Sequence, residues 1–456
     1  MPRPRSRNPK LVRKVREQVD RITKAFAEQE ITITTEYAAD GGVSGMYAEG
    51  GLLVRDEYLE RVQRILGQPV GLGHVKRVIA GVVLLPLVEA VENPDVKVPL
   101  GEQPTVKVAL GAAVEQFGKG IAAPNYALTV APVGPCPATE PQEVYDGTEP
   151  YPGICTENSG EGVLVYIADT GLLKDAEAQH PWLDDVQRAL EPDGSIEDWD
   201  PDRRPDPVDN VPKIPPYSGH GTFVAGVVRC MAPEAEVIVS NAFKIAGTAL
   251  EDDLVRELTQ ALTLGVDIFN LSITTTTTDD GPMLAFPAWL RLLRSTYKGV
   301  VCVAAAGNDG SRHPCWPAAF PEVISVGALA ADWRDRADFS NHGGWVDVYA
   351  PGRDLINAYA TGPYRCEDDP YKDQIRNFYG MCKWSGTSFS TPIVTGLIAA
   401  RMSRTGENGQ EAGAALLAEA RSQAIPGVGA ILLPCGDDCD RPERRVGRWC
   451  CCHAEK

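Results

Sequence analysis

The sequence Ser-Gly-Thr-Ser-Phe-Ser-Thr-Pro at residues 385–392 precedes the small, apolar run 393–400. This pattern predicts a tight turn that places Ser388 on the first turn of a buried helix. A helix N-terminus carries unpaired N–H groups and partial positive charge, so Ser388 would lie beside a donor for a developing oxyanion. Gly386 permits close backbone approach, and Pro392 is expected in the first helical turn, where no N–H is needed. A helix cap explains the same residues, because Ser and Thr are favoured at N-caps.

The segments that precede this stretch alternate between predicted strands and helices. Residues 162–169 form a continuous apolar run that ends in a carboxylate, as strands buried in parallel sheets do. Further strands are predicted at 237–240, 268–273, 300–305 and 323–327, and helices at 222–231, 251–264 and 388–402. This alternation predicts an α/β fold, a parallel sheet flanked by helices, with ligands at the carboxyl ends of the strands.

The N-terminal part has a different pattern. An amphipathic helix over residues 11–26 and a Gly-rich break are followed by predicted strands at 52–54, 75–87 and 126–130 and helices at 56–66 and 106–117. These pieces predict a small α+β domain. The expected organisation is a basic helix and Gly-rich link at 1–45, the α+β domain at 46–130, a Pro- and Gly-rich linker at 131–160, the α/β domain at 161–432 and a Cys-rich tail at 433–456.

Composition narrows the class of protein. The 456 residues include 43% hydrophobic residues and carry a formal net charge of -18, which argues against nucleic-acid or anionic-membrane binding. The longest apolar run, Val78 to Val88, is too short to span a bilayer, and the basic N-terminus does not resemble a signal peptide. We therefore expect a cytoplasmic protein with free thiols, while secretion by a non-standard route stays open. The sequence does not indicate an oligomeric state.

Three separate residues could form one reactive constellation. Asp169 ends a predicted buried strand, His220 opens a predicted helix between two glycines, and Ser388 opens another. Each has an ordinary structural interpretation: a capping Asp, a core His and a capping Ser. Their occurrence together in the order Asp, His, Ser favours a nucleophilic site.

The motifs around these residues resemble those of subtilisin-type serine peptidases, the subtilase family. The matching segments are 167–171 (IADTG), 219–222 (GHGT), 304–308 (AAAGN) and 386–388 (GTS). The resemblance implies a serine endopeptidase that forms an acyl-enzyme, with Ser388 as nucleophile, His220 as base, Asp169 orienting the imidazole and Asn308 in the oxyanion hole. It implies no required cofactor and a protein or peptide substrate.

The expected substrate cleft departs from the family pattern. The family's Asn-x-Ser-x-Gly-Gly wall reads Asn270-Leu-Ser-Ile-Thr-Thr275 here, so β-branched residues replace glycines. The residues expected to line the cleft are Ser272, Ile273, Thr274, Ala305, Ala306, Gly307 and Cys315. A narrow cleft favours a maturation peptidase for one partner protein as an alternative. A catalytically idle interaction module is the alternative from another class.

Several other segments carry open interpretations. Residues 52–130 resemble, in position and pattern, the prodomain that inhibits many subtilases, and the linker would then hold the cleavage site. The acidic segment between Asp169 and His220 is interpreted as a solvated charge run, with Ca²⁺ as an alternative. Insertion 362–383 is expected to form a flap over the cleft. The cysteines of the C-terminal tail, with His453, could bind zinc, but their spacing favours a disordered tail or a disulfide, so no metal site is predicted.

Overall fold

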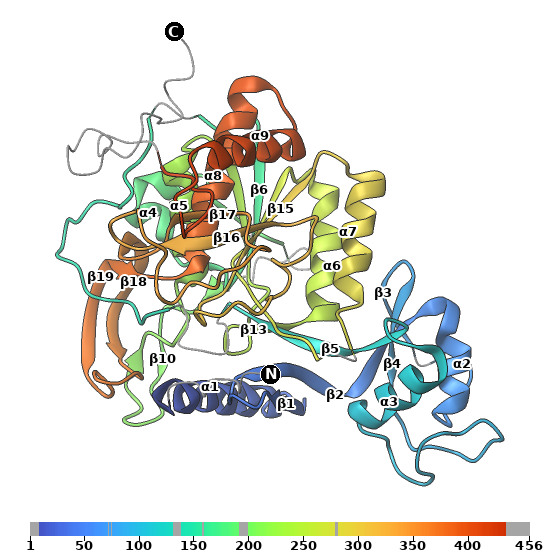
Figure 1. The fold of residues 1–456 in the computed structure, drawn as a ribbon. Helices are drawn as coiled ribbons and strands as arrows, with labels where there is room; N and C mark the ends of the chain where they lie inside the picture. Colours follow the sequence, from blue (N-terminus) through green and yellow to red (C-terminus); the bar gives the residue numbers. More distant parts are fainter. Residues whose placement is uncertain are drawn as a thin grey trace. The chain divides into compact units, whose positions relative to one another are not determined.

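The computed structural model describes residues 9–71, 73, 75–130, 138–156, 159–190, 199–278 and 281–434 (Figure 1). These residues belong to two compact units. One contains residues 1–128, 248–263 and 275–298, and the other contains 129–247, 264–274 and 299–456. Over the described residues, no helix has both the length and the apolar character needed to cross a membrane.

The second unit is built on a seven-stranded parallel sheet with the order β17-β16-β15-β14-β6-β12-β8. Its strands are β6 (Leu164–Ala168), β8 (Gln187–Arg188), β12 (Glu236–Ser240), β14 (Ile268–Leu271), β15 (Val301–Ala305), β16 (Ile324–Leu329) and β17 (Val348–Pro351). The central strands are buried along their whole length, which explains their continuous apolar sequences. The parallel α/β fold predicted from the sequence is confirmed.

Two buried helices cross this sheet and contact each other, α5 (His220–Met231) and α8 (Thr387–Thr405) (Figure 1). Small residues permit the close packing: a Cβ on Gly396 of α8 would meet the backbone oxygen of Val228 in α5 at 3.0 Å. Helix α9 (Gly409–Ser422) follows α8 and begins with a capping box between Asn408 and Glu411. The remaining short elements of this unit are β7 (Leu172–Leu173), α4 (Ala176–Gln179), η2 (Pro181–Leu183), β9 (Trp199–Asp200), β10 (Arg204–Pro205), β11 (Pro212–Lys213) and η3 (Leu262–Leu264), whose first two residues fall in the other unit.

The insertion before Ser388 forms an antiparallel hairpin of β18 (Leu355–Arg365) and β19 (Ile375–Trp384). The hairpin is the long orange pair of strands in Figure 1. It begins earlier than the expected insertion at 362, because residues 355–361 already pair with 379–384. Linker residue Gln142 forms an antiparallel bridge with Lys383 of this hairpin, so part of the linker lies along β19.

The first unit contains a mainly antiparallel sheet with the order β13-β5-β2-β4-β3, and β1 also pairs with β2. Its strands are β1 (Ile33–Tyr37), β2 (Val43–Arg55), β3 (Lys76–Ile79), β4 (Val82–Pro86), β5 (Ala122–Thr129) and β13 (Thr248–Leu250). Its helices are α1 (Pro9–Ala27), η1 (Asp56–Tyr58), α2 (Leu59–Ile65), α3 (Val106–Phe117), α6 (Glu251–Ala261) and α7 (Ala285–Thr296).

Two expectations for this unit were wrong. The single strand predicted at 75–87 is a hairpin of β3 and β4, because the chain turns at Gly81, whose φ is +87°. The predicted Gly-rich break is largely strand β2, which tolerates its glycines through a register shift between Ala48 and Leu52. The predicted helices at 56–66 and 106–117 are confirmed.

Candidate active site

The predicted reactive residues meet at one edge of the parallel sheet. Asp169 follows β6, Ser272 follows β14, and Asn308 lies three residues after β15. These three strands are neighbours and parallel, so their carboxyl ends lie together. His220 and Ser388 reach this edge as the first residue of α5 and the second residue of α8.

Asp169 and His220 form a buried pair. Their Oδ1 and Nδ1 atoms are 2.7 Å apart, and both side chains are fully buried. The Thr170 backbone N–H also donates to Asp169 Oδ1 at 2.8 Å. The imidazole packs on the rings of Phe389 and Trp384, at centroid distances of 5.3 and 5.8 Å. Its Nε2 has no hydrogen-bond partner among the described residues, so the pair leaves one ring nitrogen available.

Ser388 is positioned by a hydrogen bond that compensates for Pro392. Pro392 is the sixth residue of α8, not a residue of its first turn as expected, and it provides no N–H for the Ser388 carbonyl four residues earlier. The Ser272 hydroxyl donates to that carbonyl at 2.7 Å instead. Ser388 Oγ lies 3.5 Å from the Ser272 carbonyl oxygen. Ser272, predicted only as a cleft residue, therefore also anchors the helix that carries Ser388.

Asn308 presents an amide group with one end fixed and one end open. Its Oδ1 accepts hydrogen bonds from the Thr387 backbone N–H and the Thr387 hydroxyl, both at 2.9 Å. Its Nδ2 is buried and has no hydrogen-bond partner among the described residues. Gly307 precedes it with a φ of +97° and donates its N–H to Thr387 Oγ1 at 3.1 Å. Thr387, the middle residue of the Gly-Thr-Ser motif, therefore supports the site by fixing Asn308 and Gly307.

Asp200 is a second acid beside the Asp169–His220 pair that sequence reasoning missed. It was assigned to a solvated charge run, yet it is only 2% exposed. Its carboxylate accepts hydrogen bonds from the Gly219 backbone N–H and, at 3.0 Å, from the Thr170 hydroxyl. Burial raises its pKa well above the usual range, and the nearby Asp169 raises it further. Asp200 therefore connects the loops that carry Asp169 and His220. Its place in the acidic stretch of the sequence does not indicate this contact.

The expected cleft wall is compact. Ile273 and Thr274 are buried, and Cys315 is also buried, with its Sγ 3.2 Å from Asn341 Nδ2. Ala305 ends β15, and Ala306 and Gly307 form the turn that leads to Asn308. The predicted cleft residues therefore lie on the two chain segments that carry Ser272 and Asn308, together with Cys315.

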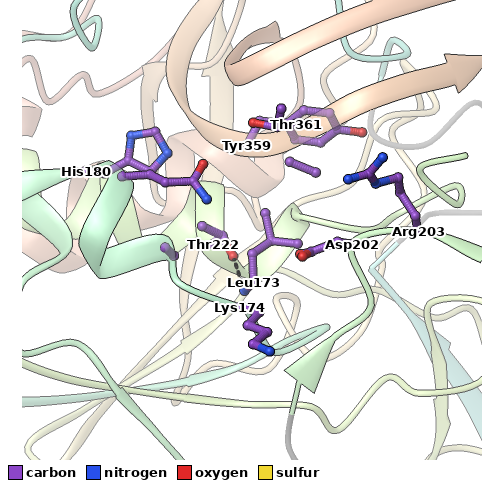
Figure 2. A pocket seen from close by; sticks show the side chains of 11 residues that line it. Leu173, Lys174, His180, Asp202, Arg203, Thr222, Tyr359 and Thr361 are labelled. Carbon is purple, nitrogen blue, oxygen red and sulfur yellow. Dashed lines mark hydrogen bonds between the residues drawn. The ribbon is translucent and has the colours of Figure 1, made fainter.

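A cavity of about 340 Å³ lies beside α5 (Figure 2). His180, Thr222 and Tyr359 line it, with the charged side chains of Asp202 and Arg203. Thr222 is two residues after His220, and its hydroxyl accepts the Leu173 N–H at 2.8 Å. Burial lowers the pKa of His180 to about 4, so this imidazole is neutral at physiological pH.

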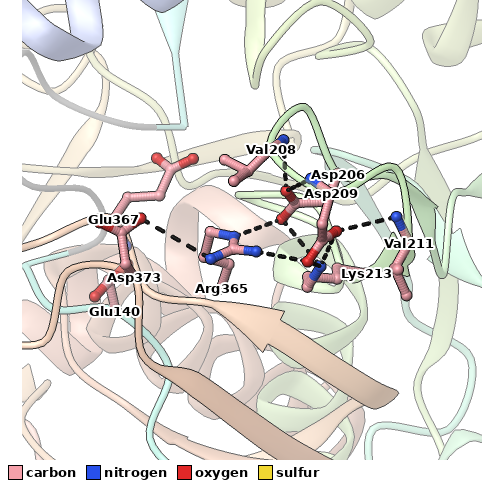
Figure 3. A network of polar contacts seen from close by, with 9 residues as sticks. All are labelled: Glu140, Asp206, Val208, Asp209, Val211, Lys213, Arg365, Glu367 and Asp373. Carbon is pink, nitrogen blue, oxygen red and sulfur yellow. Dashed lines mark hydrogen bonds and ion pairs between the residues drawn. The ribbon is translucent and has the colours of Figure 1, made fainter.

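The acidic segment before His220 contains a set of ion pairs with the hairpin (Figure 3). The Arg365 guanidinium bonds Asp206 and Asp209, each at 2.8 Å, and Lys213 Nζ lies 3.5 Å from Asp206 and 2.6 Å from Asp209. Burial acts to raise the pKa of Asp206. The hydrogen bond from Arg365, together with the other bonds and cations around the carboxylate, outweighs burial and lowers the pKa to about 2. Asp206 is itself buried, which corrects its assignment to a solvated run. These carboxylates do not fit a calcium site, because side-chain cations already neutralise them.

Metal ligands do not cluster elsewhere in the described part of the chain: no group of three or more His, Cys, Asp or Glu side chains is arranged to hold an ion. Asp193, Glu197 and Asp198 of the acidic segment lie outside the described residues. So do the tail residues of the zinc and disulfide hypotheses, Cys435, Cys439, Cys450, Cys451, Cys452 and His453.

Thr129, the last residue of β5, and Val130, which follows it, lie beside the cleft wall. Thr129 pairs antiparallel with Thr274, with N–H to carbonyl distances of 3.0 and 2.9 Å in the two directions. The Val130 N–H donates to the Gly247 carbonyl at 3.0 Å. Thr274 is two residues from Ser272, so this strand borders the segment that contacts Ser388.

Comparison with known proteins places these features in context. The model of the Subtilase family matches residues 160–427. The chain is 32% identical over 237 residues to a thermophilic serine proteinase of Bacillus sp. (strain AK1). The aligned region covers 49% of this chain and 51% of that protein. It is 27% identical over 263 residues to an intracellular serine protease of Paenibacillus polymyxa, covering 54% and 69%. The chain thus spans about half the length of the first of these relatives.

Among solved structures, the patellamide maturation protease PatA is 25% identical, with a TM-score of 0.43, over 63% of this chain and 92% of that one.

Proposed function

Because this chain belongs to the subtilase family, we propose that it is a serine endopeptidase that hydrolyses peptide bonds through an acyl-enzyme. The observation that carries the proposal is the buried Asp169–His220 pair, whose open Nε2 lies in a site that also contains Ser388 and the open amide of Asn308. A serine that only caps a helix, or a histidine that only packs in the core, would not need the other groups of this site.

In the proposed reaction, Ser388 Oγ attacks the carbonyl carbon of the scissile bond while His220 Nε2 takes its proton. Asp169 holds the Nδ1 proton through the 2.7 Å hydrogen bond, so the tautomer leaves Nε2 free to act as a base, and the carboxylate stabilises the imidazolium. The imidazolium then protonates the departing amine. Water repeats the same steps on the acyl-enzyme, which releases the acid product and restores Ser388.

The oxyanion that forms during attack needs donors that are in place beforehand. We assign this role to Asn308 Nδ2 and the Ser388 backbone N–H at the start of α8. Thr387 fixes Asn308 Oδ1 with two bonds of 2.9 Å, so the amide cannot rotate without losing both. A donor of this kind is worth about 3 kcal/mol in the transition state.

The test is hydrolysis of an unfolded protein substrate by the full chain, with Ser388→Ala and Ser390→Ala compared. Ser390 is equally buried on the same helix, and its Oγ has no hydrogen-bond partner among the described residues, so it is a matched control. We expect Ser388→Ala to abolish hydrolysis and Ser390→Ala to retain it. Hydrolysis that survives Ser388→Ala would exclude Ser388 as the nucleophile.

We further propose that the chain inhibits itself by occupying its own cleft. The support is Thr129, which exchanges two antiparallel backbone hydrogen bonds with Thr274 as an extended peptide does with a neighbouring strand. Val130 adds one bond, from its N–H to the Gly247 carbonyl. A segment bound there excludes a substrate from the same edge. The linker 131–160 follows Val130 along the sequence and would hold the self-cleavage site. Residues 131–137, 157 and 158 of this linker lie outside the described part of the chain.

Self-inhibition is tested by weakening this strand in the full chain. Val130→Pro removes the N–H that binds the Gly247 carbonyl, whereas Val130→Ala keeps it. We expect Val130→Pro to increase the rate of hydrolysis of an added peptide and Val130→Ala to change it little. Equal rates for both variants and the wild type would contradict self-inhibition.

A reducing, cytoplasmic environment is also proposed. Six described cysteines are buried thiols: Cys155, Cys230, Cys302, Cys315, Cys366 and Cys382. Burial raises the pKa of four of these thiols, to about 12 for Cys230, to about 11 for Cys366, and likewise upward for Cys302 and Cys382, so these four are unreactive. Fractionation of cells that express the chain, followed by immunodetection, tests this.

A further inference from the structure

Asn341 makes an unusual set of hydrogen bonds to the turn that carries Asn308. It is fully buried, in the loop after β16. Its backbone N–H donates to the Gly307 carbonyl at 2.9 Å, and its Nδ2 donates to the Ala306 carbonyl at 2.9 Å. Its Oδ1 accepts the backbone N–H groups of Asp309 at 3.1 Å and Ser311 at 2.9 Å. One side chain therefore holds the backbone on both sides of Asn308.

The turn has little freedom once Asn341 is in place. Gly307 has a φ of +97°, which a residue with a side chain rarely adopts, and a Cβ there would lie 2.6 Å from Asn341 Nδ2. The Asn341 Nδ2 also donates to Cys315 Sγ at 3.2 Å. Glycine adopts this φ without strain, and the surrounding hydrogen bonds determine the backbone path.

Asn308 is consequently fixed at two levels. Thr387 fixes its side-chain Oδ1, and Asn341 fixes the backbone from which that side chain projects. The Asn308 Nδ2 is the atom left without a partner among the described residues. An oxyanion donor gives its full effect only when it is held in place before the reaction.

We propose that Asn341 is a positioning residue for peptide hydrolysis, which acts by holding the 306–311 turn so that Asn308 Nδ2 faces the oxyanion. This inference rests on the proposed function. The competing explanation is that Asn341 only stabilises the fold, as any satisfied buried amide does. The two explanations differ in one respect: a positioning residue loses its kinetic effect when Asn308 has no amide to position.

A double-mutant cycle in the full chain separates them. Asn341→Ala, Asn308→Ala and the double variant are compared by kcat and KM for peptide hydrolysis, well below the unfolding temperature of each. We expect Asn341→Ala to lower kcat about 10-fold with KM within about twofold, and to lower it less than about twofold when Asn308 is already alanine. Asn341→Ser, which keeps a small polar side chain, provides the same cycle if Asn341→Ala does not fold.

Asn357→Ala is the matched control. Asn357 is also fully buried, and its Oδ1 accepts the Trp182 Nε1–H at 3.0 Å and the Ala358 N–H at 2.8 Å, away from the turn. We expect it to lower the unfolding temperature without the kcat loss that Asn341→Ala causes. An equal loss of kcat from Asn341→Ala in both backgrounds would overturn the positioning role. Absence of Ser388-dependent hydrolysis even in a Val130→Pro chain, which lacks the proposed self-inhibiting bond to Gly247, would instead refute the proposed function, and this inference with it.

Discussion

The hydrogen bond from Ser272 to the Ser388 carbonyl leads to a specific prediction about stability. Ser272→Ala removes the 2.7 Å bond and leaves a buried carbonyl without a donor, because Pro392 has no N–H. Pro392→Ala supplies the missing N–H within α8. The second substitution should therefore reduce the cost of the first.

The expected magnitude follows from the state of the carbonyl. A buried acceptor left unsatisfied costs about 1–3 kcal/mol, so Ser272→Ala alone should lower the free energy of unfolding by about that amount. In the Pro392→Ala background the same substitution should cost less than about 1 kcal/mol, because the helix satisfies the carbonyl. Asn270 Nδ2 also donates to Ser272 Oγ at 3.1 Å. Ser272→Ala removes this bond in both backgrounds, so its contribution cancels when the two costs of Ser272→Ala are subtracted.

Urea denaturation followed by circular dichroism measures all four proteins of this cycle. A coupling energy of about 1–2 kcal/mol between positions 272 and 392 is expected, with the m-value unchanged. Thr391→Val is the control. The Thr391 hydroxyl donates to the Thr387 carbonyl at 2.8 Å, and when this hydroxyl is removed the backbone N–H of residue 391 is still placed to bond that carbonyl within the helix. Equal costs of Ser272→Ala in both backgrounds would refute the reasoning about Pro392.

Further outcomes are expected from the rest of the site. Asn308→Ala should lower kcat by about 10²–10³-fold with little change in KM, since it removes one oxyanion donor; a change in KM alone would contradict this role. Burial, and to a smaller extent Asp368, raises the pKa of Glu140 to about 7. The contribution of Glu140 to the free energy of unfolding is therefore present below about pH 4.5 and is lost as the pH rises through about 7. Glu140→Gln should remove this pH dependence in urea titrations, and identical pH profiles of the variant and the wild type would refute it. EGTA should leave hydrolysis unchanged, and a loss restored by Ca²⁺ would show a required ion.

The parallel sheet and the grouping of Asp169, His220 and Ser388 could be predicted because their signals are local. Buried parallel strands have continuous apolar sequences, and Asp169, His220 and Ser388 each occur in a short motif at the end of a strand or the start of a helix. The carboxyl ends of parallel strands meet at one edge, so the order of the elements was enough to bring these residues together.

The contacts that support the site could not be predicted, because they join segments far apart in the sequence. Asp200 lies in an acidic stretch, and only its burial beside Gly219 distinguishes it from a solvated carboxylate. Asn341 is 33 residues after Asn308, and no periodicity links the two. The compensation of Pro392 by Ser272 requires the register between α8 and the segment after β14, which a single sequence does not contain.

The most direct measurement of the central claim is covalent labelling of the full chain with a fluorophosphonate, followed by mass analysis of the labelled peptide. We predict one adduct on Ser388, absent in Ser388→Ala, slowed in Asn308→Ala and faster in Val130→Pro than in the wild type. No adduct in Val130→Pro, or an adduct on another serine, would contradict the proposed serine peptidase.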